Sequence, residues 1–151
     1  MEAFVVFKYL HVVTMFFAIA LAVSTELVVR RVAMSRDPGA ISTAIARSRA
    51  LSNLSSVLFL AGIAFGIIAA LTGNMNLLAP WLVLSYVAVA AAFAVGMFIV
   101  DPWVQRLDGA AAGSSGDLAI VVEEPIARAG SWALMGLIAL LVFLMVVKPF
   151  A

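Results

Sequence analysis

Four long runs of apolar residues, separated by shorter polar connections, dominate the pattern of the sequence. The runs cover about residues 4–29, 54–71, 77–100 and 129–147. Each run approaches or exceeds the roughly 20 residues that a helix needs to cross about 30 Å of hydrocarbon. Because backbone groups in lipid must be paired within their own segment, each run predicts a transmembrane α-helix. The pattern therefore predicts an all-α integral membrane bundle, in which residues 1–151 form one domain of four transmembrane helices.

The first connection carries the signals of a short helix of its own. Asp37 is placed to act as an N-cap, and Pro38 follows at the first helical position. Ile41, Ile45 and Leu51 then fall near one face, with arginines elsewhere. The pattern predicts a short amphipathic helix on the cytoplasmic surface, ahead of the second transmembrane helix.

Prolines and acidic residues mark the remaining boundaries. Pro80 suits the first turn of the third helix. Pro102 is expected to end that helix, because the residue before a proline disfavours the α conformation. Residues 117–125 predict a second short surface helix that leads into the fourth span. Glu123 and Glu124, near its end, are expected to form a solvated face.

Composition narrows both the class of protein and its chemistry. Hydrophobic residues make up 66% of the chain and charged residues only 11%, whereas soluble domains carry about 25% charged residues. The bilayer is therefore the expected solvent, and a net charge of +1 offers no basic field for nucleic acid. The chain has no cysteine and a single histidine, which predicts neither a disulfide nor a metal site. No catalytic group is predicted, because no serine–histidine–aspartate set or carboxylate pair has suitable spacing.

Basic residues predict the orientation in the membrane. The connections after the first and third spans hold Arg30, Arg31, Arg36, Arg47, Arg49, Arg106 and Arg128. The connection at residues 72–80 holds no arginine or lysine. By the positive-inside rule, both arginine-bearing connections are cytoplasmic and both termini lie outside a bacterial plasma (inner) membrane. Lys8 and Lys148 depart from this pattern, but both lie near helix ends, where a lysine can reach the interface.

Small residues repeat at a spacing of four in three of the spans. The second span holds Gly62 and Gly66, and the fourth holds Ala129 and Ala133, with Gly136 one step on. The third span adds Ala88, Ala92 and Gly96. Small residues at this spacing share one helix face and let two backbones approach closely. They predict helix contacts within one bundle or, alternatively, the face of a homodimer.

A stripe of polar residues follows one face of the first span. Its members are Lys8, His11, Met15, Ala22 and Glu26. Lys8 and Glu26 lie 18 positions apart, which is about five helical turns, so both point in the same direction. Ionisable residues within a span usually face the bundle interior, so the stripe is expected to turn toward the other helices. Glu26 and Arg30 have the i, i+4 spacing of a salt bridge.

His11 is the candidate functional residue, and three interpretations of it remain open. In the first, a neutral His11 donates to a carbonyl, a serine or a tyrosine on another helix, with Ser85, Tyr86 and Ser131 as the available side chains. In the second, His11 is an axial ligand of a b-type haem, with Met15, Met97 or Met135 as candidates for the second ligand. Met15 is one turn away on the same helix, so the second ligand has to come from another helix or subunit. In the third, His11 and Lys8 form a path for protons or anions.

Several short motifs resemble a family of small bacterial integral membrane proteins catalogued as a domain of unknown function. They are "FKYLHVV" near the N-terminus, a basic first connection, "PW" opening the third helix and "LMVVKP" near the C-terminus. The residues that mark the resemblance are Lys8, His11, Pro80, Trp81, Met145, Lys148 and Pro149. The resemblance implies four helices in the same order and no particular activity. The "K-x-L-H-V" motif is also similar, more distantly, to the copper-resistance membrane protein D group and to the haem-binding protoporphyrinogen oxidase family HemJ.

These observations favour a structural or accessory role over an enzymatic one. The expected protein is a subunit of a larger membrane complex or a homo-oligomer, with the lipid bilayer as its surroundings and no resident cofactor. The first alternative is a redox protein that binds haem b or a porphyrin through His11. The second is a small transporter, although the middle parts of the last three spans are almost purely apolar.

Overall fold

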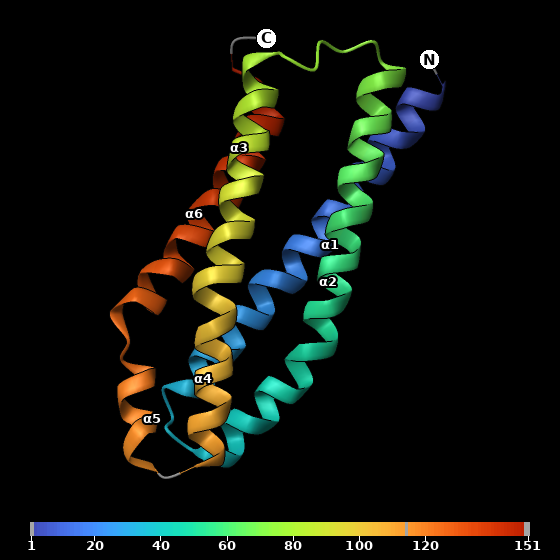
Figure 1. Cartoon of the computed structure of the whole chain (residues 1–151). Coiled ribbons are helices and arrows are strands. Elements are labelled where there is room, and N and C mark those ends of the chain that lie inside the picture. Colours follow the sequence, from blue (N-terminus) through green and yellow to red (C-terminus); the bar gives the residue numbers. More distant parts are fainter. Residues whose placement is uncertain (1, 114, 150–151) are drawn as a thin grey trace.

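The computed structural model describes residues 2–113 and 115–149, and the described residues form helices joined by short turns (Figure 1). The elements are α1 (Glu2–Ala33), α2 (Pro38–Thr72), α3 (Pro80–Val95), η1 (Gly96–Val100), α4 (Asp101–Ala112), α5 (Ser115–Val122) and α6 (Pro125–Val147). Four helical stretches are long and apolar enough to cross a membrane: Glu2–Ala33, Pro38–Thr72, Pro80–Ala112 and Leu118–Val147. The prediction of an all-α fold with four such helices is confirmed.

Helix α2 is longer than the sequence pattern predicted. Asp37 caps it as expected, because its side chain accepts hydrogen bonds from the backbone N–H groups of Gly39 and Ala40. The separate amphipathic surface helix was a wrong prediction, because the helix that Asp37 begins continues without a break to Thr72. Residues 40–61 contain no glycine or proline that would interrupt it. Its first turns still bury apolar residues toward the bundle, although Leu51 is 43% exposed.

The third long helical stretch, Pro80–Ala112, continues through the proline that was expected to end it. Just before Pro102 the chain forms the π-helical segment η1, in which the N–H of Asp101 bonds to the carbonyl of Gly96 five residues earlier. A proline has no N–H to donate, and its ring collides with the carbonyl four residues before it in a regular α-helix. The wider π turn changes the local hydrogen-bond register. The predicted end at Pro102 is therefore wrong, and α4 continues to Ala112.

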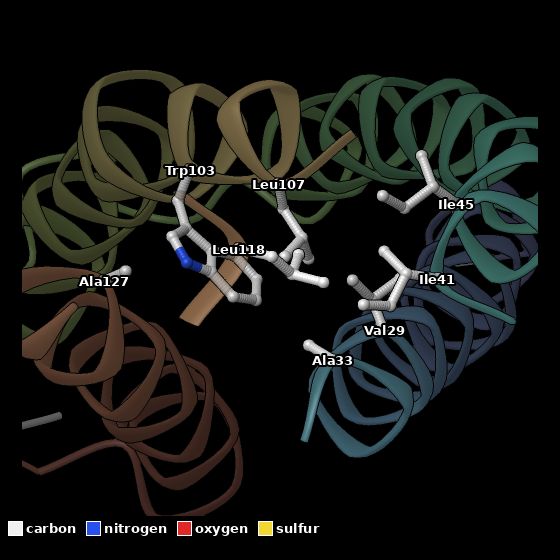
Figure 2. Packing of buried hydrophobic residues seen from close by; sticks show 8 residues of the cluster. All are labelled: Val29, Ala33, Ile41, Ile45, Trp103, Leu107, Leu118 and Ala127. Atoms are coloured by element: carbon white, nitrogen blue, oxygen red, sulfur yellow. The ribbon is translucent and has the colours of Figure 1, made fainter. Parts of the chain in front are cut away.

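The helices pack as two pairs that meet at one end of the bundle. Helix α1 lies along α2, and α3 lies along α6, while α4 contacts α2 and α5. Figure 1 shows both termini at the same end, which we call the terminal end. The opposite end holds the turn between α1 and α2 and the connection between α4 and α5, and we call it the arginine end. The core cluster lies there and comprises Val29, Ala33, Ile41, Ile45, Trp103, Leu107, Leu118 and Ala127 (Figure 2).

Glycines allow the closest helix approaches. A Cβ atom at Gly62 would lie 2.6 Å from the sulfur of Met15, and one at Gly66 would lie 2.8 Å from Nδ1 of His11. These two glycines therefore serve contact between α1 and α2 within the bundle. Gly130 has the same role on α6, where a Cβ would lie 2.5 Å from Ile99. Gly96 makes no such contact within the bundle, because a Cβ there would meet no atom within 4 Å, and it begins the π segment.

Candidate functional site

His11 lies where α1, α2 and α6 come together toward the terminal end. Its Nδ1 is 2.7 Å from the carbonyl oxygen of Gly62, and its Nε2 is 3.4 Å from the sulfur of Met145. A carbonyl can only accept a hydrogen bond, so Nδ1 carries the proton and donates it. In the neutral imidazole Nε2 then carries no proton, and the Met145 thioether is itself only a weak acceptor, so their contact is packing and not a hydrogen bond. The single histidine thus bonds to α2 and packs against α6.

His11 bonds to a carbonyl on another helix, as its first interpretation allowed, and to none of the three side chains named with it. The hydroxyl of Ser85 donates to the carbonyl of Trp81 on its own helix, and Tyr86 is 47% exposed. Ser131 lies with Glu26 and Arg30 instead. That carbonyl belongs to Gly62, and side-chain patterns do not reveal which carbonyl a histidine will meet. The glycine spacing was the available signal, because two residues without side chains on α2 let the imidazole lie against the backbone.

The methionines around His11 bear on the haem interpretation. Met97 is 67% exposed, and the sulfur of Met15 lies against Gly62, whereas Met145, which was not among the candidates, faces Nε2 directly. A metal between a nitrogen and a sulfur on opposite sides needs a separation of about 4.3 Å, from bond lengths of about 2.0 and 2.3 Å. The observed separation is 3.4 Å. His11 Nε2 and the Met145 sulfur are therefore too close together to bind one haem iron from opposite sides.

Lys8 does not share the environment of His11. Its side chain is exposed, and its ammonium lies 5.7 Å from the centre of the Phe4 ring on the same helix. Lys148 similarly lies 5.4 Å from the ring centre of Trp81. Both contacts are cation–π interactions near helix ends, where a lysine stem can lie along apolar surface. The predicted inward orientation of the stripe holds for Glu26, which is buried, and is wrong for Lys8.

A second polar cluster joins α1 to α6 toward the arginine end. The guanidinium of Arg30 donates from Nε to Glu26 at 3.0 Å and to the hydroxyl of Ser131 at 2.8 Å. It also donates to the carbonyl of Ala127, and the Ser131 hydroxyl donates to Glu26. The carbon at the centre of the guanidinium lies 4.7 Å from the centre of the Trp103 ring. Glu26 is 8% exposed and Arg30 is 23% exposed, so this is a largely buried ion pair.

This cluster combines a predicted contact with two that the sequence did not disclose. The salt bridge between Glu26 and Arg30 is confirmed. Ser131 and Trp103 join it from distant parts of the chain, and no local spacing connects them with α1. Glu26 Oε1, the Arg30 Nε and the Ser131 hydroxyl all have partners in the same cluster, which offsets the cost of burying the charges. The arrangement holds two helices together.

Two cavities accompany these clusters. One has a volume of about 170 Å³ and lies between α3 and α6, with a purely aliphatic lining that includes Leu84, Ala88 and Leu137. The other has a volume of about 220 Å³ and opens at the arginine end beside Arg30. Its lining includes Arg36, Arg128 and Glu123, and Arg36 and Glu123 form an ion pair. The two acidic residues expected to form a solvated face are thus both paired with arginines, since Glu124 binds Arg106.

No family model, curated protein or solved structure matches the chain. The resemblance to a bacterial membrane family therefore stays a prediction. Within the part of the chain that the structure describes, no group of three histidine, cysteine or acidic side chains is placed to hold a metal ion.

Proposed function

We propose that the protein is a structural or accessory subunit of a membrane complex, in which its partner is another membrane protein or a second copy of itself. The observation that carries this proposal is the difference between two sets of small residues. Gly62, Gly66 and Gly130 are used within the bundle, where a side chain would collide with a neighbouring helix. Ala129, Ala133 and Gly136 form a face of α6 that is exposed, and a Cβ at Gly136 would meet no atom within 4 Å.

An exposed face of small residues is the surface that membrane helices use for close association. In lipid there is little hydrophobic drive between helices, so they associate through close packing of small residues and through polar contacts. The face on α6 leaves room for a second helix to approach. Its neighbours Ile126 and Trp132 are 64% and 74% exposed, so a partner there would meet large side chains at the rim.

The interior of the bundle supports the same proposal. Among the residues that the structure describes, no buried side-chain nitrogen or oxygen lacks a hydrogen-bond partner. The polar groups of the interior hold helices together, and this arrangement favours a scaffold over an enzyme or a transporter.

The test is the mass of the native particle. Isolated from its own membrane in mild detergent, the protein is expected to elute as a complex heavier than its 15.9 kDa chain. Ala133→Leu is expected to release the chain as a monomer, because leucine fills the space that a partner helix needs. Val87→Leu is the matched control, since Val87 is an exposed apolar residue on α3. A wild-type chain that elutes alone, with no partner by mass spectrometry, would contradict the proposal.

We further propose that the membrane is a bacterial inner membrane with the arginine end on the cytoplasmic side. The arginines of the connections gather at that end, and the positive-inside rule places such residues in the cytoplasm. The absence of cysteine from the chain makes the test simple. Single variants Glu2→Cys and Ser42→Cys lie at opposite ends, and both positions are exposed. A maleimide that cannot cross membranes is expected to label only Glu2→Cys in intact cells, and labelling of only Ser42→Cys would reverse the orientation.

A further inference from the structure

The cavity at the arginine end is lined by cations from separate parts of the chain. Arg30 belongs to α1, Arg36 to the turn after it and Arg128 to the first turns of α6. Trp103 of α4 forms part of the wall, and Glu123 is an acidic member of the lining. The volume of about 220 Å³ corresponds to about seven water molecules at about 30 Å³ each. A phosphate group therefore fits with room for its ester substituents.

The three arginines differ in how they are already used. Arg30 is held by Glu26, Ser131 and the ring of Trp103, so it forms a fixed part of the wall. Arg36 pairs with Glu123, and both of these side chains are more than half exposed. Among the residues that the structure describes, Arg128 has no carboxylate at ion-pair distance. The cavity thus offers the unpaired guanidinium of Arg128 and that of Arg36, whose salt bridge to Glu123 is exposed and therefore weak.

The start of α6 adds to the positive potential. No side chain caps the first turn of α6, and the helix begins at Pro125 beside the cavity lining. Unpaired N–H groups at a helix start favour a bound anion. An arginine guanidinium also matches phosphate geometry through two parallel hydrogen bonds. The two features support one another, because Arg128 belongs to that same first part of α6.

The cavity also lies at the boundary between apolar and polar sequence. Arg30 directly follows the first apolar run, and Arg128 directly precedes the fourth. Met34 in the lining is 70% exposed. A ligand with a charged head and an apolar tail would place its head on the arginines and its tail along Met34 and the adjoining apolar runs. This is the arrangement that basic pockets use for anionic lipid headgroups.

We propose that this cavity binds the phosphate of an anionic lipid headgroup. The phosphate bonds to Arg128, and Arg36 exchanges Glu123 for the phosphate. An exposed salt bridge contributes only about 0–1 kcal/mol, so the exchange has a small cost. Arg30 stays with Glu26 and forms the floor of the site with Trp103. The inference rests on the proposed membrane location, since it requires the arginine end to lie at the headgroup layer.

The test measures binding of phosphatidylglycerol to the full chain in detergent micelles, by titration and native mass spectrometry. Arg128→Gln is expected to raise the apparent Kd about tenfold, the effect of one charge-assisted hydrogen bond. Arg47→Gln is the matched control, since Arg47 is exposed and outside the cavity lining, and it is expected to leave the Kd unchanged. Glu123→Gln is expected to lower the Kd, because it frees Arg36. Phosphatidylcholine, which carries no net charge, is expected to bind at least tenfold more weakly.

Three outcomes would overturn the inference. Equal losses in Arg128→Gln and Arg47→Gln would indicate diffuse attraction to the whole basic surface. An unchanged Kd in Arg128→Gln would remove the cavity as the site. Displacement of the lipid by inorganic phosphate at the lipid's own binding concentration would make free phosphate the ligand. Since micelles have no sides and the readout is lipid binding, failure here is distinct from failure of the orientation or oligomer tests.

Discussion

The two ends of the bundle are held together by different means. At the arginine end, Trp103 fills the centre of a cluster drawn from α1, α2, α4, α5 and α6, and the Glu26–Arg30 pair fastens α1 to α6 beside it. At the terminal end the closest contacts between α1 and α2 are those of glycines against side chains of α1, with a hydrogen bond from His11 to the carbonyl of Gly62. The arginine end thus combines a cluster of apolar side chains with a buried ion pair, whereas α1 and α2 toward the terminal end depend on close approach at two glycines.

The largest expected effect separates the three tryptophans. Trp103 is 1% exposed, Trp81 is 7% exposed and Trp132 is 74% exposed. Trp103→Ala is expected to lower the free energy of unfolding by about 4 kcal/mol, because it opens a cavity in the only core cluster among the described residues. Trp81→Ala, at the terminal end, is expected to cost about half as much, and Trp132→Ala close to nothing. The measurement is unfolding by sodium dodecyl sulfate in mixed micelles. Equal losses of unfolding free energy in Trp103→Ala and Trp81→Ala would show that the two ends do not differ in this respect.

The next effect tests close approach at the terminal end. Gly62→Leu is expected to destabilise the protein by about 3 kcal/mol, because its side chain would enter the space of Met15 and Thr14. Gly96→Leu is the matched control, since a side chain there meets open space. It is expected to unfold at the same detergent fraction as the wild type. A Gly62→Leu protein as stable as the control would show that α1 and α2 do not depend on this contact.

A smaller effect is expected from the ion pair at the arginine end. Glu26→Gln leaves the Arg30 charge in a largely buried place with neutral partners, which is expected to cost about 2 kcal/mol. The exposed pair of Glu123 with Arg36 provides the comparison. The loss in Glu26→Gln is expected to persist in 0.5 M salt, whereas any loss in Glu123→Gln is expected to vanish there, because salt screens exposed charges. Loss of the Glu26→Gln effect in salt would mean that the pair is open to solvent.

The smallest effect concerns the histidine. His11→Phe keeps an aromatic ring and removes the hydrogen bond to the carbonyl of Gly62, and it is expected to cost about 1 kcal/mol, which is typical of a hydrogen bond between membrane helices. Met145→Leu removes only the sulfur contact and is expected to cost less than half of that value. The same unfolding measurement ranks the two variants. A larger loss of stability in Met145→Leu than in His11→Phe would show that the Met145 thioether contact stabilises the protein more than the hydrogen bond to the carbonyl of Gly62.

The sequence disclosed the features that depend on local spacing and on length. Apolar runs of sufficient length identified the helices that the structure contains, and the i, i+4 spacing identified the Glu26–Arg30 pair. Features that depend on distant parts of the chain were missed. Ser131 lies 101 residues from Arg30, and Met145 lies 134 residues from His11. No local sequence pattern encodes which faces of two helices will meet, so these partners can be identified only from the three-dimensional structure.

The errors at helix boundaries have a different cause. Pro102 was interpreted from its own conformational preference, without the turn that precedes it. The arginines after Asp37 were taken to mark a surface helix, although nothing in the sequence interrupts α2 between that start and Thr72. A boundary signal shows that a helix can end at a residue. The helix can still continue past that residue when the backbone hydrogen bonds on both sides of it can form.

The π-helical segment from Gly96 to Val100 changes the direction in which the side chains of α4 point relative to those of α3. Before the segment, α3 packs against α6, and after it, α4 packs against α2 and α5. One additional residue in a turn offsets all later side chains by about 100° around the axis, relative to an uninterrupted α-helix. An uninterrupted α-helix of the same sequence would turn Trp103 and Leu107 away from the cluster in Figure 2. Deletion of a single residue from the segment is expected to remove the π turn and to leave both side chains facing the cluster. One continuous helical stretch can thereby turn one set of side chains toward α6 in α3 and a different set toward α2 and α5 in α4.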